Sequence, residues 1–196
     1  MVNPRVGGRR RASPAVPAAA YPQPMPDDWI RQLGDPVLRL SAKPVRKLDE
    51  VLAAQLRRMA RTLEEADGAG LAATQVGILR RAFVYRLTPA HPVQALIEPR
   101  ILAASAERAE FLEGCLSFNA VALRVRRPLA VRVGARDLDG REVRIEAEGI
   151  EASLLQHEID HLEGILTLDR AEPAERRRAL AALADAERAP TLSASA

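Results

Sequence analysis

The 196-residue chain has few aromatic residues, since phenylalanine, tryptophan and tyrosine together make up 3% of it. Stacking on nucleotide bases depends on such side chains, so it is not expected as a principal mode of binding. The single cysteine, Cys115, excludes an internal disulfide. In a reducing compartment it must be a core residue, a metal ligand or a nucleophile. No run of 18 apolar residues is present, so neither a membrane-spanning segment nor a membrane partner is expected.

The net charge is only +3 at pH 7, and much of the basic excess comes from four arginines in the N-terminal dozen residues. A nucleic-acid surface needs basic residues gathered on the folded part, so no direct nucleic-acid binding is expected. Residues 1–26 contain no acidic residue, as in an organelle transit peptide or a twin-arginine signal, but their apolar run Ala15–Ala20 is short and broken by Pro17, so no convincing hydrophobic region is present. We therefore expect a cytoplasmic protein of bacterial type and treat organelle targeting by residues 1–26 as the less favoured alternative.

The length is typical of one domain with loose ends. We expect residues 1–28 to form a disordered tail rich in arginine, proline and alanine. Residues 29–172 would form the single folded domain. Residues 173–196 would form a surface helix followed by a second disordered tail.

A helix is predicted for Leu48–Ala66, where apolar residues recur every three or four positions, at Leu52, Leu56, Met59 and Leu63. Asp49 or Ser41 is the expected N-terminal cap. The helix should end at the glycines of the Asp67-Gly68-Ala69-Gly70 segment.

Short strands are predicted at Arg81–Leu87, 94–98 and 109–116. The clearest hairpin has alternating apolar residues on both sides of Asp139-Gly140, with Val131 and Val133 before the turn and Val143, Ile145 and Ala147 after it. These elements predict antiparallel pairing.

His157, Glu158 and His161 form a His-Glu-x-x-His pattern on a helix predicted for Glu151–Glu163, with Gly164 as its C-terminal cap. Positions i and i+4 share a helix face, so the two imidazoles can bind one metal ion while the glutamate acts as a base. The alternative is a surface helix with a satisfied histidine pair. With the short strands, this helix indicates an α+β fold: antiparallel strands packed around a central metal-binding helix, with an N-terminal helix and flexible tails.

A catalytic metal needs three protein ligands and one open position. Cys115 is the attractive third ligand because a thiolate binds zinc or iron strongly, and His91 is the other candidate. The alternative for Cys115 alone is a buried structural thiol.

Three separated segments resemble the signature motifs of the peptide deformylase family: GAGLAATQVG at 68–77, EGCLS at 113–117 and QHEIDHL at 156–162. The GDPVLR segment at 34–39 also resembles the N-terminal region of that family. The similarity extends from about Trp29 to Arg170 and leaves only the two ends of the chain outside it.

The resemblance implies that Cys115, His157 and His161 hold one divalent metal ion, natively Fe²⁺ and replaceable by Zn²⁺, Ni²⁺ or Co²⁺. Glu158 would take a proton from water and return it to the departing amine. The implied activity is a metal-dependent hydrolase that removes the formyl group from the N-terminal formyl-methionine of newly synthesised proteins and releases formate. Its partners would be formyl-methionyl nascent peptides, met at the ribosome exit.

The resemblance also implies that the backbone N–H of Leu116 and the side-chain amide of Gln75 stabilise the oxyanion. A hydrogen bond that only braces the metal loop is the alternative for Gln75. Gly70 would belong to the segment along which the substrate lies, although simple turn geometry is its alternative. We expect the methionine pocket to include Ile150 and Leu154, which precede His157 on the same helix face.

The chain departs from the family pattern in two places, because Phe118–Ala122 lacks the usual arginine or tyrosine and Glu98-Pro99 replaces the common Asn-Pro. These changes motivate an alternative, a divergent paralogue that acts on other N-acylated amines or serves as an inhibitor-tolerant copy. A third, less favoured hypothesis is a non-catalytic binding module stabilised by a metal ion.

Overall fold

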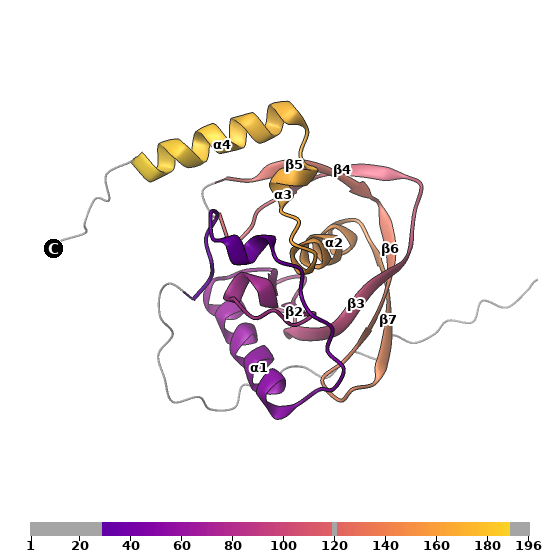
Figure 1. Ribbon diagram of the computed structural model, residues 1–196. Coiled ribbons are helices and arrows are strands. Elements are labelled where there is room, and N and C mark those ends of the chain that lie inside the picture. Colours follow the sequence, from indigo (N-terminus) through magenta and orange to yellow (C-terminus); the bar gives the residue numbers. More distant parts are fainter. Residues whose placement is uncertain (1–28, 119–120, 189–196) are drawn as a thin grey trace, which may run out of the picture.

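The computed structural model describes residues 29–118 and 121–188 as an α+β fold, which confirms the predicted class (Figure 1). Its elements follow in the order η1 (Pro36–Arg39), α1 (Glu50–Glu65), β1 (Gly70–Ala72), η2 (Ala73–Val76), β2 (Ala82–Tyr85), β3 (Gln94–Ala104), β4 (Arg108–Glu113), β5 (Leu123–Pro128), β6 (Ala130–Arg136), β7 (Glu142–Glu148), α2 (Ile150–Leu162), α3 (Thr167–Arg170) and α4 (Pro173–Arg188). Five antiparallel strands form one sheet in the order β1-β2-β3-β6-β7, and β4 and β5 form a second.

Helix α1 matches the helix predicted from the apolar stripe. Its cap is Asp49, whose carboxylate accepts a hydrogen bond of 2.7 Å from the Leu52 N–H. The predicted apolar positions are all buried, and they pack with β2 and β3 into one core cluster. The stripe therefore fixes which face of α1 covers the sheet.

Two strand predictions needed correction. Strand β3 continues to Ala104 through an irregular register beside Glu98, whose positive φ of 56° marks the bend. Strand β4 ends at Glu113, so Cys115 lies in the loop after the strand and not within it. The predicted hairpin is present as β6 and β7, and its register places Val133 opposite Ile145.

Helix α2 lies inside the curve of the large sheet, with its long axis nearly along the line of sight in Figure 1. Its residues Leu155, Ile159 and Leu162 pack against β2, β3, β6 and β7. Gly164 follows the helix with a positive φ of 73°, as predicted. A Cβ atom there would come within 2.6 Å of the Arg39 carbonyl oxygen, so a glycine is required.

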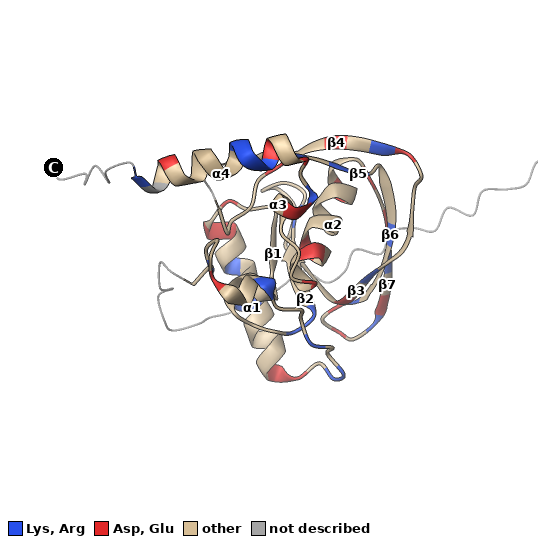
Figure 2. Cartoon of the chain, turned by 45° about the horizontal axis from the view of Figure 1, so that its top comes forward, with Lys and Arg blue, Asp and Glu red and all other residues tan. Residues whose placement is uncertain are grey.

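Helix α4 occupies the region where a surface helix was predicted, and it packs on β5 and α3. In Figure 2 the charged residues of α4 lie toward its two ends, whereas acidic and basic residues both lie along the β6–β7 hairpin, where Arg132 and Glu146 form an ion pair of 2.6 Å. None of the helices in the described ranges is long and apolar enough to span a bilayer. The tail predicted for residues 1–28 lies outside the described residues, and so does the end of the predicted segment 173–196, from residue 189 on.

Candidate active site

The structure brings Cys115, His157 and His161 together. The Cys115 Sγ lies 3.2 Å from Nε2 of His161, which lies 3.2 Å from Nε2 of His157. One ligand atom from each residue falls within a cluster no wider than 4.8 Å, and all three residues are buried. His91, the other candidate ligand, lies apart in an exposed turn and contacts Thr88.

The donor set fits a divalent transition metal, because one sulfur and two imidazole nitrogens are ligands that zinc and iron accept. Within the described residues no fourth histidine, cysteine or carboxylate joins the cluster. Three ligands leave a coordination position for water or substrate, as in catalytic sites. The family and this cluster together support a bound metal ion.

Glu158 lies beside the cluster and is only 1% exposed. Its Oε2 atom has no hydrogen-bond partner among the described residues. Burial raises the pKa of this carboxyl to about 7, because the anion loses its hydration. A group that exchanges its proton near neutrality is suited to general acid–base catalysis.

Gly70 on β1 lies directly against this carboxylate. A Cβ atom at Gly70 would come within 2.1 Å of Oε1 of Glu158, so any side chain would displace the glutamate. The glycine is therefore explained by close approach, since its φ lies outside the positive region that only glycine favours.

A network of buried charged groups orients His157. Nδ1 of His157 lies 3.0 Å from Oε2 of Glu113. Arg127 donates one hydrogen bond to each oxygen of the same carboxylate, at 2.5 Å to Oε1 and 2.9 Å to Oε2. Arg127 also bonds to Asp160 at 2.7 Å, and Asp160 pairs with Arg170 of α3. The bond at Nδ1 leaves Nε2 of His157 facing the cluster, as a metal ligand requires.

Burial alone would raise the pKa of Glu113, but hydrogen bonds from His157 and Arg127 outweigh it and hold the pKa at about 2. Burial also opposes a charge on His157, yet its bonds to Cys115 and Glu113 raise its pKa well above the usual value. Hydrogen-bond partners, and not burial, therefore set the direction of both pKa shifts.

Sequence reasoning missed the role of Arg127. It did not assign a strand to residues 123–128, where Leu123 and Val125 alternate with exposed arginines. Every second residue of β5 faces the core, and Arg127 falls at such a position, like Leu123 and Val125. A charged residue at a core-facing position was therefore the feature of the sequence that could have indicated its role.

Gln75 on η2 is buried and holds the loop that carries Cys115. Its Oε1 accepts from the Ala72 N–H at 2.8 Å, and its Nε2 donates to Oγ of Ser117 at 3.1 Å and approaches Sγ of Cys115 at 3.5 Å. These bonds give Gln75 the bracing role. Its oxyanion role stays a prediction. The N–H of Leu116 has no acceptor among the described residues.

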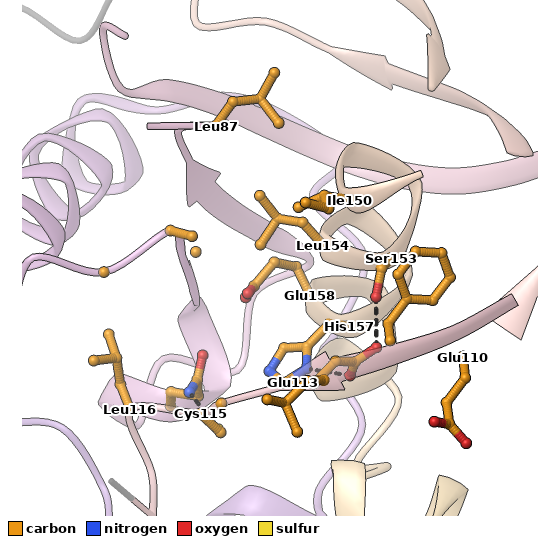
Figure 3. Close-up of a pocket in the computed structure, with 17 residues that line it drawn as sticks. Leu87, Glu110, Glu113, Cys115, Leu116, Ile150, Ser153, Leu154, His157 and Glu158 are labelled. Atoms are coloured by element: carbon orange, nitrogen blue, oxygen red, sulfur yellow. Dashed lines mark hydrogen bonds and ion pairs between the residues drawn. The ribbon is translucent and has the colours of Figure 1, made fainter. Parts of the chain in front are cut away.

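The cluster opens into a cavity of about 630 Å³. Figure 3 shows Glu158 reaching from α2 toward the loop of Cys115 and Leu116, with Leu154 and Ile150 on the preceding turns of the helix. Leu154 is partly buried, whereas Ile150 is 77% exposed and lies at the mouth. Phe111, Leu112 and Leu116 also line the cavity, which is therefore largely apolar beside Glu158 and the ligand cluster.

The unusual segment Phe118–Ala122 does not line this cavity in its described residues, and Asn119 and Ala120 lie outside the described residues. Phe118 and Val121 are buried in a core cluster beneath α4. The Ala122 carbonyl accepts a hydrogen bond of 2.9 Å from Arg178. The described part of this segment therefore serves packing against α4.

The profile of the polypeptide deformylase family matches residues 27–177. A peptide deformylase of Thermotoga neapolitana is 47% identical over 147 residues, which cover 75% of this chain and 88% of that relative. One from Treponema pallidum is 44% identical over 151 residues, covering 77% and 92%.

Solved structures agree with this assignment. A peptide deformylase from Legionella pneumophila superposes with a TM-score of 0.76 and 36% identity, covering 82% of this chain and 98% of that one. One from Synechococcus elongatus, solved in complex with actinonin, has a TM-score of 0.77 and 40% identity and covers 87% and 93%. These relatives support the predicted enzyme and do not favour the paralogue or the binding module. The chain therefore belongs to the polypeptide deformylase family.

Proposed function

We propose that this site uses Fe²⁺ held by Cys115, His157 and His161 to remove the formyl group from N-terminal formyl-methionine. The observation that carries the proposal is the juxtaposition of three ligand atoms, within 4.8 Å of one another, with the unpartnered carboxylate of Glu158 at the base of a cavity. Zn²⁺, Ni²⁺ or Co²⁺ would also suit one sulfur and two nitrogens.

The reaction adds water across the formyl amide bond, so that formate and a free amine are released. The metal ion, when bound, acidifies water and polarises the formyl carbonyl. Glu158 accepts the proton of the attacking water and delivers it to the nitrogen as the C–N bond breaks. Its pKa of about 7 suits both steps, because the group gains and loses the proton with little cost near neutral pH.

The oxyanion that forms at the carbonyl needs donors already in place. Leu116 would supply its backbone N–H, which lacks another acceptor in the described part of the chain. Gln75 would supply its Nε2, which lies beside Cys115 and Ser117. One of its two hydrogens bonds to Ser117 and braces the loop, and the other, which approaches the sulfur of Cys115 at 3.5 Å, is the one that would turn to the substrate.

The substrate would lie along β1 at Gly70, with its methionine side chain in the apolar cavity beside Leu154 and Ile150. Leu154→Trp tests this placement, since a bulky ring there should reduce turnover of formyl-methionyl peptides more than that of peptides with a smaller first residue. An unchanged preference would remove Leu154 from the pocket.

Formyl-methionyl nascent peptides are the proposed partners, met as they leave the ribosome, and the bacterial cytoplasm is the proposed location. Residues 29–172 are the proposed catalytic domain, with the flanking segments 1–28 and 173–196 outside it. None of these assignments requires nucleic acid or a membrane.

Formate release from formyl-Met-Ala-Ser by protein loaded anaerobically with Fe²⁺ tests the activity. Glu158→Ala should keep its metal and lose about 10²- to 10⁴-fold in kcat, the usual contribution of general acid–base catalysis. Glu148→Ala, which removes an exposed carboxylate on β7, is the control. Normal turnover by Glu158→Ala would show that the base is another group.

Elemental analysis of Cys115→Ser tests the ligand set. The hydroxyl is a poorer ligand than a thiolate, so we expect the metal content to fall strongly. Loading the wild type with each metal and comparing the rates tests the preference for iron.

A further inference from the structure

Residues Trp29–Leu33, here called the N-terminal strap, form hydrogen bonds with both segments that carry the proposed oxyanion donors. The N–H of Arg31 donates to the backbone carbonyl of Gln75 at 2.7 Å. The N–H of Leu33 donates to the carbonyl of Ser117 at 2.8 Å. The strap therefore links η2 to the Cys115 loop through two short backbone hydrogen bonds.

Gln32 lies between these two donors and adds a side-chain bond. Its Nε2 donates to the carbonyl of Leu116 at 3.3 Å and to that of Ile30 at 3.0 Å. One amide group thus joins the strap's own backbone to the residue whose N–H is the proposed oxyanion donor.

The strap is held at its start by α1. The guanidinium of Arg58 stacks 4.0 Å from the ring centre of Trp29, and both Trp29 and Ile30 pack against the core cluster that contains α1. Beyond η1 the same segment reaches the end of the metal-binding helix, where the Ala42 N–H donates to the Leu162 carbonyl at 2.8 Å. The N-terminal segment therefore contacts all three motifs from one continuous piece of chain.

Between the two loops themselves, the side chain of Gln75 makes the direct hydrogen bonds, to Ser117 and to the sulfur of Cys115. If Gln75 is to face an oxyanion, its amide cannot alone fix the distance between the loops. Donors stabilise a transition state only when their spacing is set before the reaction. The strap supplies that constraint through backbone carbonyls and leaves the donor groups free for substrate.

We propose that the N-terminal strap is a positioning element of the oxyanion hole, with Arg31 acting through its backbone N–H and Gln32 through its side chain. The inference rests on the proposed function, because it assigns a task to the loops of Gln75 and Leu116. It predicts that weakening the strap lowers kcat without loss of metal and without a matching rise in KM.

Two substitutions at Arg31 form a matched pair. Arg31→Ala removes the exposed side chain and keeps the N–H, whereas Arg31→Pro removes the same side chain and also the donor to Gln75. We expect Arg31→Ala to stay within about twofold of wild-type kcat. Arg31→Pro should lose about 10-fold, less than the complete removal of one oxyanion donor.

Gln32→Met is the second variant, because it keeps the length of the side chain and removes its donors without restricting the backbone. We expect kcat to fall about threefold, the size expected for a weak neutral hydrogen bond. Metal content and KM should stay at wild-type values. If Arg31→Pro does not fold, Gln32→Met alone decides.

Trp29 is the only tryptophan of the chain and lies in the strap itself, so its fluorescence reports whether the strap stays in place. A purely structural strap would give a red-shifted emission and metal loss, with normal kcat per bound metal, and that result overturns the proposal. Wild-type kcat in the folded Arg31→Pro or in Gln32→Met overturns it as well. An inactive wild type with full metal would instead refute the proposed function.

Discussion

Both faces of α2 are buried, but one is apolar and the other is polar, so they need different kinds of partner. On one face Leu155, Ile159 and Leu162 contact the large sheet and need only apolar neighbours of suitable volume. On the other face Ser153 and His157 contact Glu113 of β4, while Asp160 contacts arginines of β5 and α3. The apolar face therefore holds the helix in the core, whereas the polar face depends on particular partners from three other elements, β4, β5 and α3.

The largest effect is expected when the polar face loses its central cation. Arg127→Met should destabilise the fold by about 3–5 kcal/mol, because Glu113 and Asp160 would remain as buried carboxylates without their shared partner. Urea unfolding followed by Trp29 fluorescence, with chelator present, measures this change without a contribution from metal binding.

Arg126→Met is the matched control, since Arg126 immediately precedes Arg127 on β5 and is exposed. We expect it to change stability by less than about 0.5 kcal/mol. Equal losses in both variants would mean that the strand, and not the buried network, determines the cost.

The same contrast decides what could be predicted from the sequence. The stripes of α1 and α2, the β6–β7 hairpin and the metal-ligand spacing are local patterns, and the structure has them. The end of β4 before Cys115 and the extension of β3 past Pro99 depend on pairing with distant strands. The periodicity of a short segment does not show which distant strand it pairs with, so it cannot predict where the strand ends.

The site was predicted to a similar extent. Cys115, His157, His161 and Glu158 lie in recognisable motifs, so the sequence alone could predict that they lie close together. Arg127 and the strap residue Gln32 belong to no motif that the sequence analysis used. Their importance comes from contacts across 14 residues for Arg127 and 84 for Gln32, which only the fold brings together.

A second prediction concerns how the stability that the polar face contributes depends on pH. The pKa of Glu113 is about 2 in the fold, against about 4.5 for a free glutamate, which is the value expected in the unfolded chain. The carboxylate therefore stabilises the fold fully above about pH 4.5, and this contribution disappears as the pH falls toward 2. The difference corresponds to about 3 kcal/mol.

Glu113→Gln, which keeps the shape of the side chain and removes its charge, isolates the contribution of the carboxylate to stability. The stability advantage of the wild type over the variant should grow by about 3 kcal/mol between pH 2 and pH 5. Urea midpoints across that range provide the measurement. Parallel curves for the two proteins would contradict the assigned role of Glu113.

The apolar face is tested by Leu155→Ala. Removing a fully buried leucine should cost about 2–3 kcal/mol, since the cavity left behind collapses only in part. Because no metal partner is removed, folded protein should keep its metal content and kcat at a temperature well below the transition. A loss of metal in the folded variant would show that the two faces are not independent.

The smallest effect is expected at Ser153, whose hydroxyl donates to Oε1 of Glu113 at 2.6 Å. Ser153→Ala removes one of four contacts to that carboxylate and should cost about 1–2 kcal/mol, because Arg127 and His157 remain in place. A double-mutant cycle with Glu113→Gln measures the coupling directly. Coupling near zero would mean that the hydroxyl merely fits the wall of the cavity, whereas coupling of about 1 kcal/mol would place Ser153 among the partners that make the polar face specific.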